Sequence, residues 1–161
     1  MLRIAQIAPL YESVPPRLYG GTERIVHYLT EELVALGYDV TLFASGDSIT
    51  TARLIPVAPE ALRLGNCKDP LAWHILQLGE VFDRMTEFDL LHFHTDYLHF
   101  PFTNAWNKTT LTTLHGRQDL PELKHLYQKY SNIPVVSISN AQRLPLPMAN
   151  WAGTVYHGLP L

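Results

Sequence analysis

The stretch from Pro9 to Glu23 reads Pro-Leu-Tyr-Glu-Ser-Val-Pro-Pro-Arg-Leu-Tyr-Gly-Gly-Thr-Glu and joins an apolar run to a helical pattern. The apolar run, Leu2 to Ala8, is typical of a buried parallel strand. A loop between such a strand and a helix opens at the carboxyl end of a sheet, where α/β proteins bind ligands. Gly20 and Gly21 lack Cβ atoms, so the backbone there is free to take positive φ and to approach a ligand closely. We therefore predict a ligand-binding loop, with an ordinary βα connection as the alternative.

The helix that follows is predicted to be capped by Thr22, with Glu23 in its first turn. Its free N–H groups and positive dipole end suit a phosphate. Apolar residues then recur at spacings of four, four and three, which predicts one core face. These residues are Ile25, Leu29, Leu33 and Leu36, and Gly37 ends the pattern.

Strand and helix patterns alternate along the rest of the chain. Further strands are predicted at Tyr38–Ala44, Arg53–Val57, Leu90–His94, Thr109–Leu114, Ile133–Ile138 and Trp151–Tyr156, with Pro56 indicating an edge. Helices are predicted from Pro70, capped by Asp69, to about residue 86, at Pro121–Tyr130, within Thr95–Lys108 and after Ser139. This alternation predicts an α/β, Rossmann-like, doubly wound parallel sheet of about six to seven strands with helices on both faces. Residues 1–161 are expected to form one domain.

The amino-acid composition disfavours several classes of partner and location. The net charge of −3 offers no broad basic surface, so nucleic acid is not an expected partner. A single cysteine, Cys67, excludes an internal disulfide framework and favours a reducing compartment. The amino terminus does not resemble a signal peptide, and no apolar stretch is long enough to span a membrane. We expect a cytoplasmic domain.

Several histidines gather between residues 92 and 99. His92, His94, Asp96 and His99 lie within eight residues, and alternate positions of a strand point the same way. A His-x-His pair is able to bind zinc. The metallo-β-lactamase type of hydrolase uses His-x-His-x-Asp-His, but Tyr97 stands where the last ligand belongs. A polar ligand-facing role, locally hydrogen-bonded histidines and a metal site all remain open, and no metal is the expectation.

His115 and Gly116 follow directly after the predicted strand Thr109–Leu114. A histidine at the carboxyl end of a parallel strand points toward the common crevice, where its ring can bind a hydroxyl or act as acid or base. A histidine that only caps the strand is the alternative. The chain has no phosphate loop of the Gly-x-x-x-x-Gly-Lys-Ser/Thr type, no Gly-x-Gly-x-x-Gly and no Gly-x-Ser-x-Gly, which disfavours nucleotide hydrolysis, nicotinamide binding and serine hydrolysis.

Six segments in this order resemble family-four glycosyltransferases of the GT-B fold. They are Gly20–Glu23, Leu33–Ser45, Asp89–Asp96, Thr113–Gly116, Val136–Asn140 and Val155–Gly158. The resemblance covers essentially the whole chain and implies the amino-terminal, acceptor-side half of that fold. It also implies transfer of a sugar from a nucleotide-sugar to an acceptor, with retention of configuration and without a cofactor or metal.

The resemblance assigns roles to residues. Gly20 and Gly21 match the glycine loop near the donor diphosphate, and His115, followed by Gly116, matches the histidine near the reacting sugar. Substrate contacts are implied more loosely at the positions Asp96, Ser139, Asn140 and Glu23. His157 stands where asparagine is more usual in the segment that opens the linker.

The family binds most of its nucleotide on a second, carboxyl-terminal domain that carries a Glu-x7-Glu pair, and this chain ends where that domain is expected. The first hypothesis is therefore half of a glycosyltransferase, inactive alone. A stand-alone sugar- or nucleotide-binding module is the second, and a metal-dependent hydrolase using His92, His94 and Asp96 is the third. An exposed cleft face also leaves a homodimer open.

Overall fold

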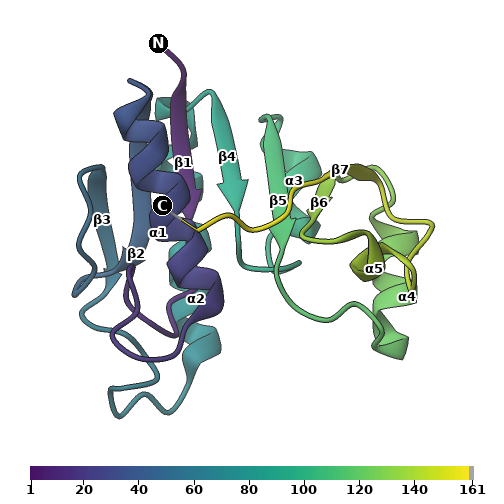
Figure 1. The fold of residues 1–161 in the computed structure, drawn as a ribbon, viewed down its shortest axis with the longest axis horizontal. Helices are drawn as coiled ribbons and strands as arrows, with labels where there is room; N and C mark the ends of the chain where they lie inside the picture. Colours follow the sequence, from purple (N-terminus) through teal and green to yellow (C-terminus); the bar gives the residue numbers. More distant parts are fainter. Residues whose placement is uncertain (160–161) are drawn as a thin grey trace.

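The computed structural model describes residues 1–159 and shows a sheet of seven parallel strands (Figure 1). Residues 160–161, the end of the predicted domain 1–161, lie outside the described residues. The strands are β1 (Arg3–Ile7), β2 (Asp39–Ser45), β3 (Arg53–Ala58), β4 (Leu90–Phe93), β5 (Thr110–Leu114), β6 (Val135–Ser137) and β7 (Trp151–Thr154). The helices are α1 (Gly21–Ala35), α2 (Pro70–Arg84), η1 (Met85–Glu87), α3 (Phe100–Trp106), α4 (Pro121–Lys129) and α5 (Asn140–Arg143). The predicted fold class, an α/β Rossmann-like parallel sheet of about six to seven strands with helices on both faces, is confirmed.

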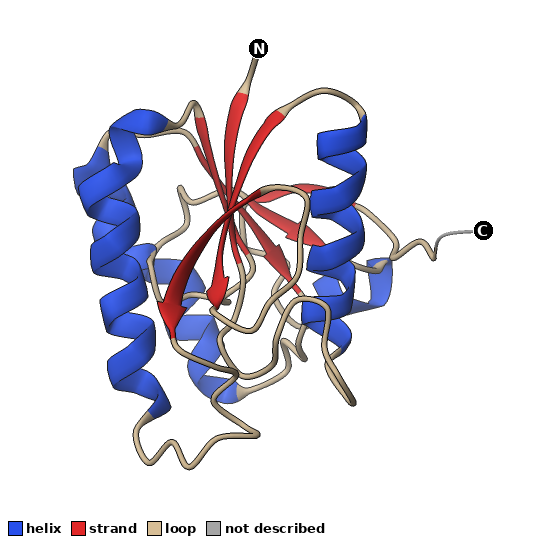
Figure 2. Ribbon diagram, turned by 90° about the vertical axis from the view of Figure 1, so that its left-hand side faces the viewer, coloured by secondary structure: helices blue, strands red, loops and turns tan. Residues whose placement is uncertain are grey.

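Helices cover both faces of the sheet (Figure 2). Val26 of α1 packs with Leu42, whereas Leu78 of α2 packs with Phe43, the next residue of the same strand. Successive residues of a strand point to opposite faces, so α1 and α2 lie on opposite sides. The helices α3 and α4 join the α2 side through Trp106 and through a cluster around Leu114 and Tyr127. No helix within residues 1–159 is long and apolar enough to cross a bilayer.

The strand order β3-β2-β1-β4-β5-β6-β7 places the change of winding direction between β1 and β4. These two strands are neighbours although about eighty residues separate them, with Ile4 opposite Leu90 and Ile7 opposite Phe93. Loops that leave the two strands diverge there and open a crevice at their carboxyl ends, which is where open α/β sheets bind ligands.

The start and the buried face of α1 differ from the sequence prediction. Gly20, not Thr22, is the N-cap residue; its φ of 169° is extended, and neither Gly20 nor Gly21 adopts the left-handed conformation. The buried side chains are Glu23, Val26 and Thr30, while Leu36 is 73% exposed. The apolar stripe chosen from the sequence therefore faces away from the core cluster, because a polar glutamate and a threonine occupy core positions.

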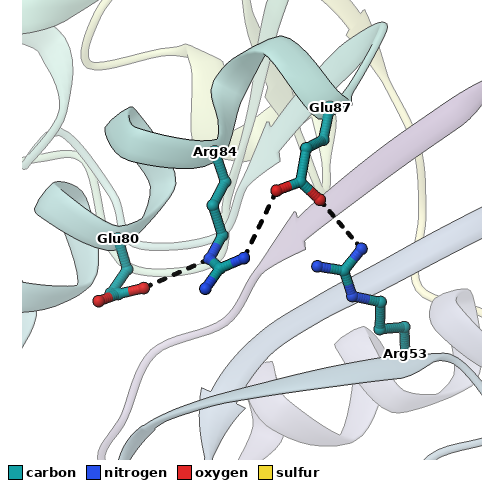
Figure 3. A network of polar contacts seen from close by, with 4 residues as sticks. All are labelled: Arg53, Glu80, Arg84 and Glu87. Carbon is teal, nitrogen blue, oxygen red and sulfur yellow. Dashed lines mark hydrogen bonds and ion pairs between the residues drawn. The ribbon is translucent and has the colours of Figure 1, made fainter.

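Charged residues mark one edge of the sheet. β3 is an edge strand, as Pro56 predicted, and begins at Arg53. Arg53 Nη1 lies 2.9 Å from Glu87 Oε2, and Arg84 bridges Glu87 to Glu80 at 3.4 Å on each side (Figure 3). Exposed ion pairs contribute little to stability, so the value of this network lies in placing charge along an otherwise open edge.

Gly20 is a position where the fold demands glycine. A Cβ atom there would lie 2.6 Å from Pro16 Cβ and 3.2 Å from Glu12 Cγ, whereas a Cβ at Gly21 would meet no atom within 4 Å. We expect Gly20→Ala to lower the free energy of unfolding by about 1–3 kcal/mol, because the proline ring has to move. Gly21→Ala, the matched control, should be neutral or stabilising by up to about 1 kcal/mol. Urea denaturation measures both, and equal stabilities would contradict this account.

Candidate functional site

A cavity of about 660 Å³ opens at the carboxyl ends of the central strands. Loops that follow β1, β4, β5 and β6 enclose it, and the segment after β7 reaches it through His157. The lining residues are Pro9, Tyr11, Tyr19, Gly20, Gly21, Thr22, Glu23, Arg63, His74, His94, Thr95, Asp96, Tyr97, Leu98, His115, Gly116, Ile138 and His157. The structure thus brings together Gly20, Gly21, Glu23, Asp96, His115 and Gly116, which the sequence had selected separately.

The N-terminus of α1 forms one wall. Gly20, Gly21 and Thr22 line the cavity, and the N-cap residue, Gly20, has no side chain to cap the helix. The first helical bond runs from Arg24 N–H to the Gly20 carbonyl, at 3.0 Å, so the preceding N–H groups lie outside the helix's own ladder. Free N–H groups and the helix dipole make this wall suited to an anion.

Two buried carboxylates support this wall. Glu12 is 2% exposed, and its Oε1 lies 3.0 Å from Arg63 Nη1. Burial raises the pKa of Glu23, against the lowering by hydrogen bonds from the backbone N–H groups of Glu23 and Glu12. Glu23, in the first turn of α1, thus lies near Glu12 in the loop after β1, and it also lines the cavity.

Two histidines in contact with each other form another part of the lining. His94 Nδ1 lies 2.9 Å from His115 Nε2, and His94 Nε2 lies 2.8 Å from Oε1 of Gln6. Burial lowers the pKa of His115 to about 3 and lowers the pKa of His94 well below its usual value. Both rings are neutral near pH 7, so they act as hydrogen-bonding groups there rather than as acids.

The histidines that lie close in the sequence do not form one cluster. The ring of His92 lies 4.2 Å from that of His94, between centroids, but His99 stacks on Phe93 at 3.7 Å, on the other face of the sheet. Both ring nitrogens of His94 already have partners. Within residues 1–159, no group of three His, Cys, Asp or Glu side chains is placed to hold a metal ion. The hydrolase hypothesis therefore has no ligand set in this part of the chain.

Asp96 has an unusual backbone. Its φ is 52°, a left-handed conformation that few non-glycine residues adopt and that is found preferentially at functional sites. The residue as a whole is exposed, but the surrounding protein partly desolvates its carboxyl group and so raises the pKa of that group. The side chain lines the cavity, where it is placed to contact a ligand hydroxyl.

Ser139 and Asn140 lie at the carboxyl end of β6, where the cavity is lined by Ile138 rather than by either of them. Ser139 caps α5, because its Oγ accepts a hydrogen bond from Gln142 N–H at 3.1 Å. Gln142 in turn donates to the Gly116 carbonyl at 2.8 Å and so fixes the loop after β5. The sequence prediction of a short, Ser139-capped helix is confirmed, and a direct substrate contact of this pair stays a prediction.

Two polar side chains of α2 hold the loop after β1, and the sequence reasoning missed both. Gln77 Nε2 donates to the carbonyl oxygens of Ala8 and Phe43 at 2.8 and 3.3 Å. Leu10 N–H donates to His74 Nε2 at 3.2 Å. The only signal in the sequence is that His74 and Gln77 share one face of the helix, at a spacing of three, with the buried Leu78 and Val81 close by.

A second cavity, of about 720 Å³, lies on the α1 side of the sheet. Ile25 and Leu29 of α1 line it together with Leu111 and Val136 of the sheet. The segment 155–159 closes it and crosses in front of β5 and β4 toward α1 (Figure 1). This explains why the apolar stripe of α1 is only partly buried, since it borders a groove instead of the core.

Comparison with known proteins points to one family. A family model described as Glycosyltransferase Family 4 matches residues 19–145. The crystal structure of AviGT4, a glycosyltransferase involved in avilamycin A biosynthesis, is similar with a TM-score of 0.64 and 20% identity, over 99% of this chain and 43% of that one. Sucrose-phosphate synthase from Thermosynechococcus elongatus is similar with a TM-score of 0.64 and 16% identity, over 97% of this chain and 47% of that one. At these identities the two structures show the fold alone, and this chain spans less than half of each. A comparison with curated proteins gave no match.

The buried histidines predict a loss of stability in mild acid. Burial lowers the pKa of His99 to about 3, whereas histidines of an unfolded chain have a pKa of about 6.5. In mild acid the unfolded chain therefore binds more protons than the folded one. Each such histidine therefore adds to the free energy of unfolding, and this contribution is fully present above the pKa of the unfolded chain. It falls by about 1.4 kcal/mol between about pH 7.5 and about pH 5.5.

We expect His99→Phe combined with Thr112→Val to reduce this loss by that amount, because the ring keeps its stack on Phe93 while the hydroxyl bonded to His99 is removed as well. Urea denaturation at both pH values measures the difference. Substitution of the exposed His125 by Gln is the control and should leave the loss as in the parent chain. An unchanged loss in the double variant would show that His99 is not neutral in the fold.

Proposed function

The chain belongs to Glycosyltransferase Family 4, and on that basis we propose that it forms the acceptor-side half of the active site of a retaining, metal-independent glycosyltransferase. The observation that supports this most is the cavity at the strand ends, which the N-terminus of α1 lines together with His115 and Asp96. An anion-binding wall facing polar groups suited to hydroxyls is the arrangement that a nucleotide-sugar and its acceptor require.

The donor diphosphate would lie against Gly20 and Gly21. The cavity side of Gly21 is open, and the N–H groups of the first turn lie outside the helix's own hydrogen bonds. As the bond to the sugar breaks, charge develops on the leaving diphosphate, and N–H groups already fixed in the fold stabilise that charge without reorganising. In this proposal they take the place of a metal ion, and basic groups of a second domain complete the site.

The sugars would lie between His115 and Asp96. Because His115 stays neutral near pH 7, it would orient a hydroxyl rather than transfer a proton. The Asp96 carboxylate faces the same cavity and is suited to accept a hydrogen bond from the acceptor. Tyr11, Tyr19 and Tyr97 border the cavity and offer flat apolar surface to a sugar ring.

We further propose that the active protein contains a second domain. The chain covers 43% and 47% of the two similar solved structures, so each of those proteins has more than a further domain's length beyond the matched region. A second domain facing the strand ends would close the cavity, exclude water and hold the nucleotide. Without it, the cavity is half of a site.

The isolated 161 residues should therefore transfer no sugar. We expect the native reading frame to continue past the codon for Leu161 for about one further domain, roughly 150–200 residues, and to encode a Glu-x7-Glu pair. Release of nucleoside diphosphate from a panel of nucleotide-sugars, with and without a mixture of sugar acceptors, compares the two polypeptides. Turnover by the isolated chain would contradict the half-site proposal, and a stop codon after Leu161 would favour a binding module.

Gly21 offers a direct test of the diphosphate wall. In the full polypeptide, we expect Gly21→Asp to reduce kcat/KM for the nucleotide-sugar at least about tenfold, because a carboxylate at this wall repels the phosphates. The same charge favours the N-terminus of α1, so the free energy of unfolding should be unchanged or higher. Gly21→Ala is the matched control and should keep its activity, since a Cβ meets no atom within 4 Å. Normal kcat/KM in Gly21→Asp would place the diphosphate elsewhere.

A further inference from the structure

One arginine lines the cavity at the strand ends. Among the lining residues within 1–159, Arg63 is the single lysine or arginine, and it lies in the loop between β3 and α2. Its backbone N–H donates to the Tyr11 carbonyl at 2.9 Å, and the N–H of Leu62 donates to the Leu10 carbonyl at 2.9 Å. These two bonds join the loop to the one that follows β1, so the backbone of Arg63 is held beside the cavity.

A buried carboxylate holds the guanidinium group in place. Glu12 Oε1 lies 3.0 Å from Arg63 Nη1, and the side chain of Glu12 is 2% exposed whereas that of Arg63 is 51% exposed. A buried charge without a partner is unfavourable, so Glu12 keeps the arginine from turning away into solvent. Because the carboxylate is the buried member of the pair, a ligand in the cavity meets the positive group.

The ion pair leaves hydrogen-bond donors of Arg63 unused. A guanidinium group carries several N–H groups in a planar fork, and Glu12 contacts one of its nitrogens through one oxygen. Phosphate and carboxylate groups accept two parallel hydrogen bonds from such a fork, and these bonds are stronger than those between neutral groups. An exposed guanidinium that is held in position and has free donors is therefore suited to bind an anion.

Glu12 also separates Arg63 from the N-terminus of α1. Its Cγ lies 3.2 Å from the position that a Cβ atom of Gly20 would occupy, while its Oε1 contacts Arg63. A phosphate that bridged Gly20 and Arg63 would lie close to this carboxylate, and the like charges would repel each other. An anion bound at Arg63 is therefore distinct from the donor diphosphate that we place against Gly20 and Gly21.

Two exposed tyrosines lie beside the guanidinium group. The ring centre of Tyr19 lies 6.0 Å from Arg63 Cζ, and Tyr19 is 80% exposed. Tyr11, whose carbonyl accepts the hydrogen bond from Arg63 N–H, is 42% exposed and also lines the cavity. Aromatic rings offer flat apolar surface on which the C–H groups of a sugar ring can pack. A cation next to such surface matches a sugar that carries a negative group.

We propose that Arg63 binds a phosphate or carboxylate group of the acceptor, so that the acceptor is a phosphorylated or acidic sugar. That the anion belongs to an acceptor rests on the proposed function. The anion site itself does not, because it follows from the contacts that Arg63 makes with Glu12, Tyr11 and Tyr19 at the cavity.

Binding to the full polypeptide, measured by isothermal titration calorimetry without a nucleotide-sugar, tests the anion site apart from catalysis. The probes are glucose, galactose and mannose, each compared with its 6-phosphate and its uronic acid. We expect at least one anionic sugar to bind at least about tenfold more tightly than its neutral parent sugar. Arg63→Gln should abolish this preference, and glutamine can still donate a hydrogen bond to the buried Glu12. Arg63→Lys keeps the charge but not the fork and should show an intermediate preference.

Arg17→Gln is the matched control. Arg17 is 65% exposed, pairs with Asp47 and does not line the cavity, so its loss should leave the preference as in the parent protein. Equal binding of neutral and anionic sugars by the parent protein overturns the proposal. An unchanged preference in Arg63→Gln overturns it as well.

Steady-state kinetics of the full polypeptide identify the substrate that carries the anion. Arg63→Gln should raise the KM for the acceptor about tenfold, while kcat and the KM for the nucleotide-sugar change less than about twofold. A raised KM for the nucleotide-sugar instead would assign Arg63 to the donor diphosphate and overturn the proposal. If the parent protein transfers no sugar, the proposed function fails, while the calorimetry still decides whether Arg63 binds an anion.

Discussion

All seven strands point the same way, and the rest of the molecule depends on this constraint. Parallel strands require a crossover between each pair, so the connections at the carboxyl ends all converge on one edge. The reversal of strand order between β1 and β4 then separates two of these connections and leaves a recess. The glycines at the start of α1, Asp96 after β4 and His115 after β5 meet because of topology, although they lie far apart in the chain.

Polar contacts, rather than apolar packing, fix the details of this recess. Gln77 of α2 holds the backbone after β1, Gln142 of α5 holds the backbone after β5, and Gln6 holds His94. Apolar contacts are tolerant of small shifts, whereas a hydrogen bond requires a given distance and direction. Three buried or half-buried amides thus give the loops one geometry, which a site that acts on directional bonds needs.

The sequence was sufficient to predict the strands, because short apolar runs bounded by glycine, proline and asparagine or aspartate are typical of buried strands. It also identified the caps Asp69 and Ser139, whose contacts lie within three residues. It was insufficient for the buried face of α1, where Glu23 and Thr30 occupy core positions that a pattern of apolar residues assigns elsewhere. The pairing of Gln6 with His94 joins positions 88 residues apart, and only the folded sheet brings them together. His99 is close to His92 in the sequence but not in the fold, because the pleat of β4 and the turn that follows it place His99 on the other face of the sheet.

The edges of the sheet affect whether the chain aggregates while it is being synthesised. A parallel sheet forms slowly, since each strand waits for a distant partner, and open edges then invite pairing between molecules. Here β3 begins at Arg53, which belongs to a charged network, and contains Pro56, which lacks an N–H, while β7 at the other edge has only four residues. Neither edge is a good template for a further strand. The proline, the charged network and the short strand that end the sheet at its two edges therefore also protect the nascent polypeptide from aggregation.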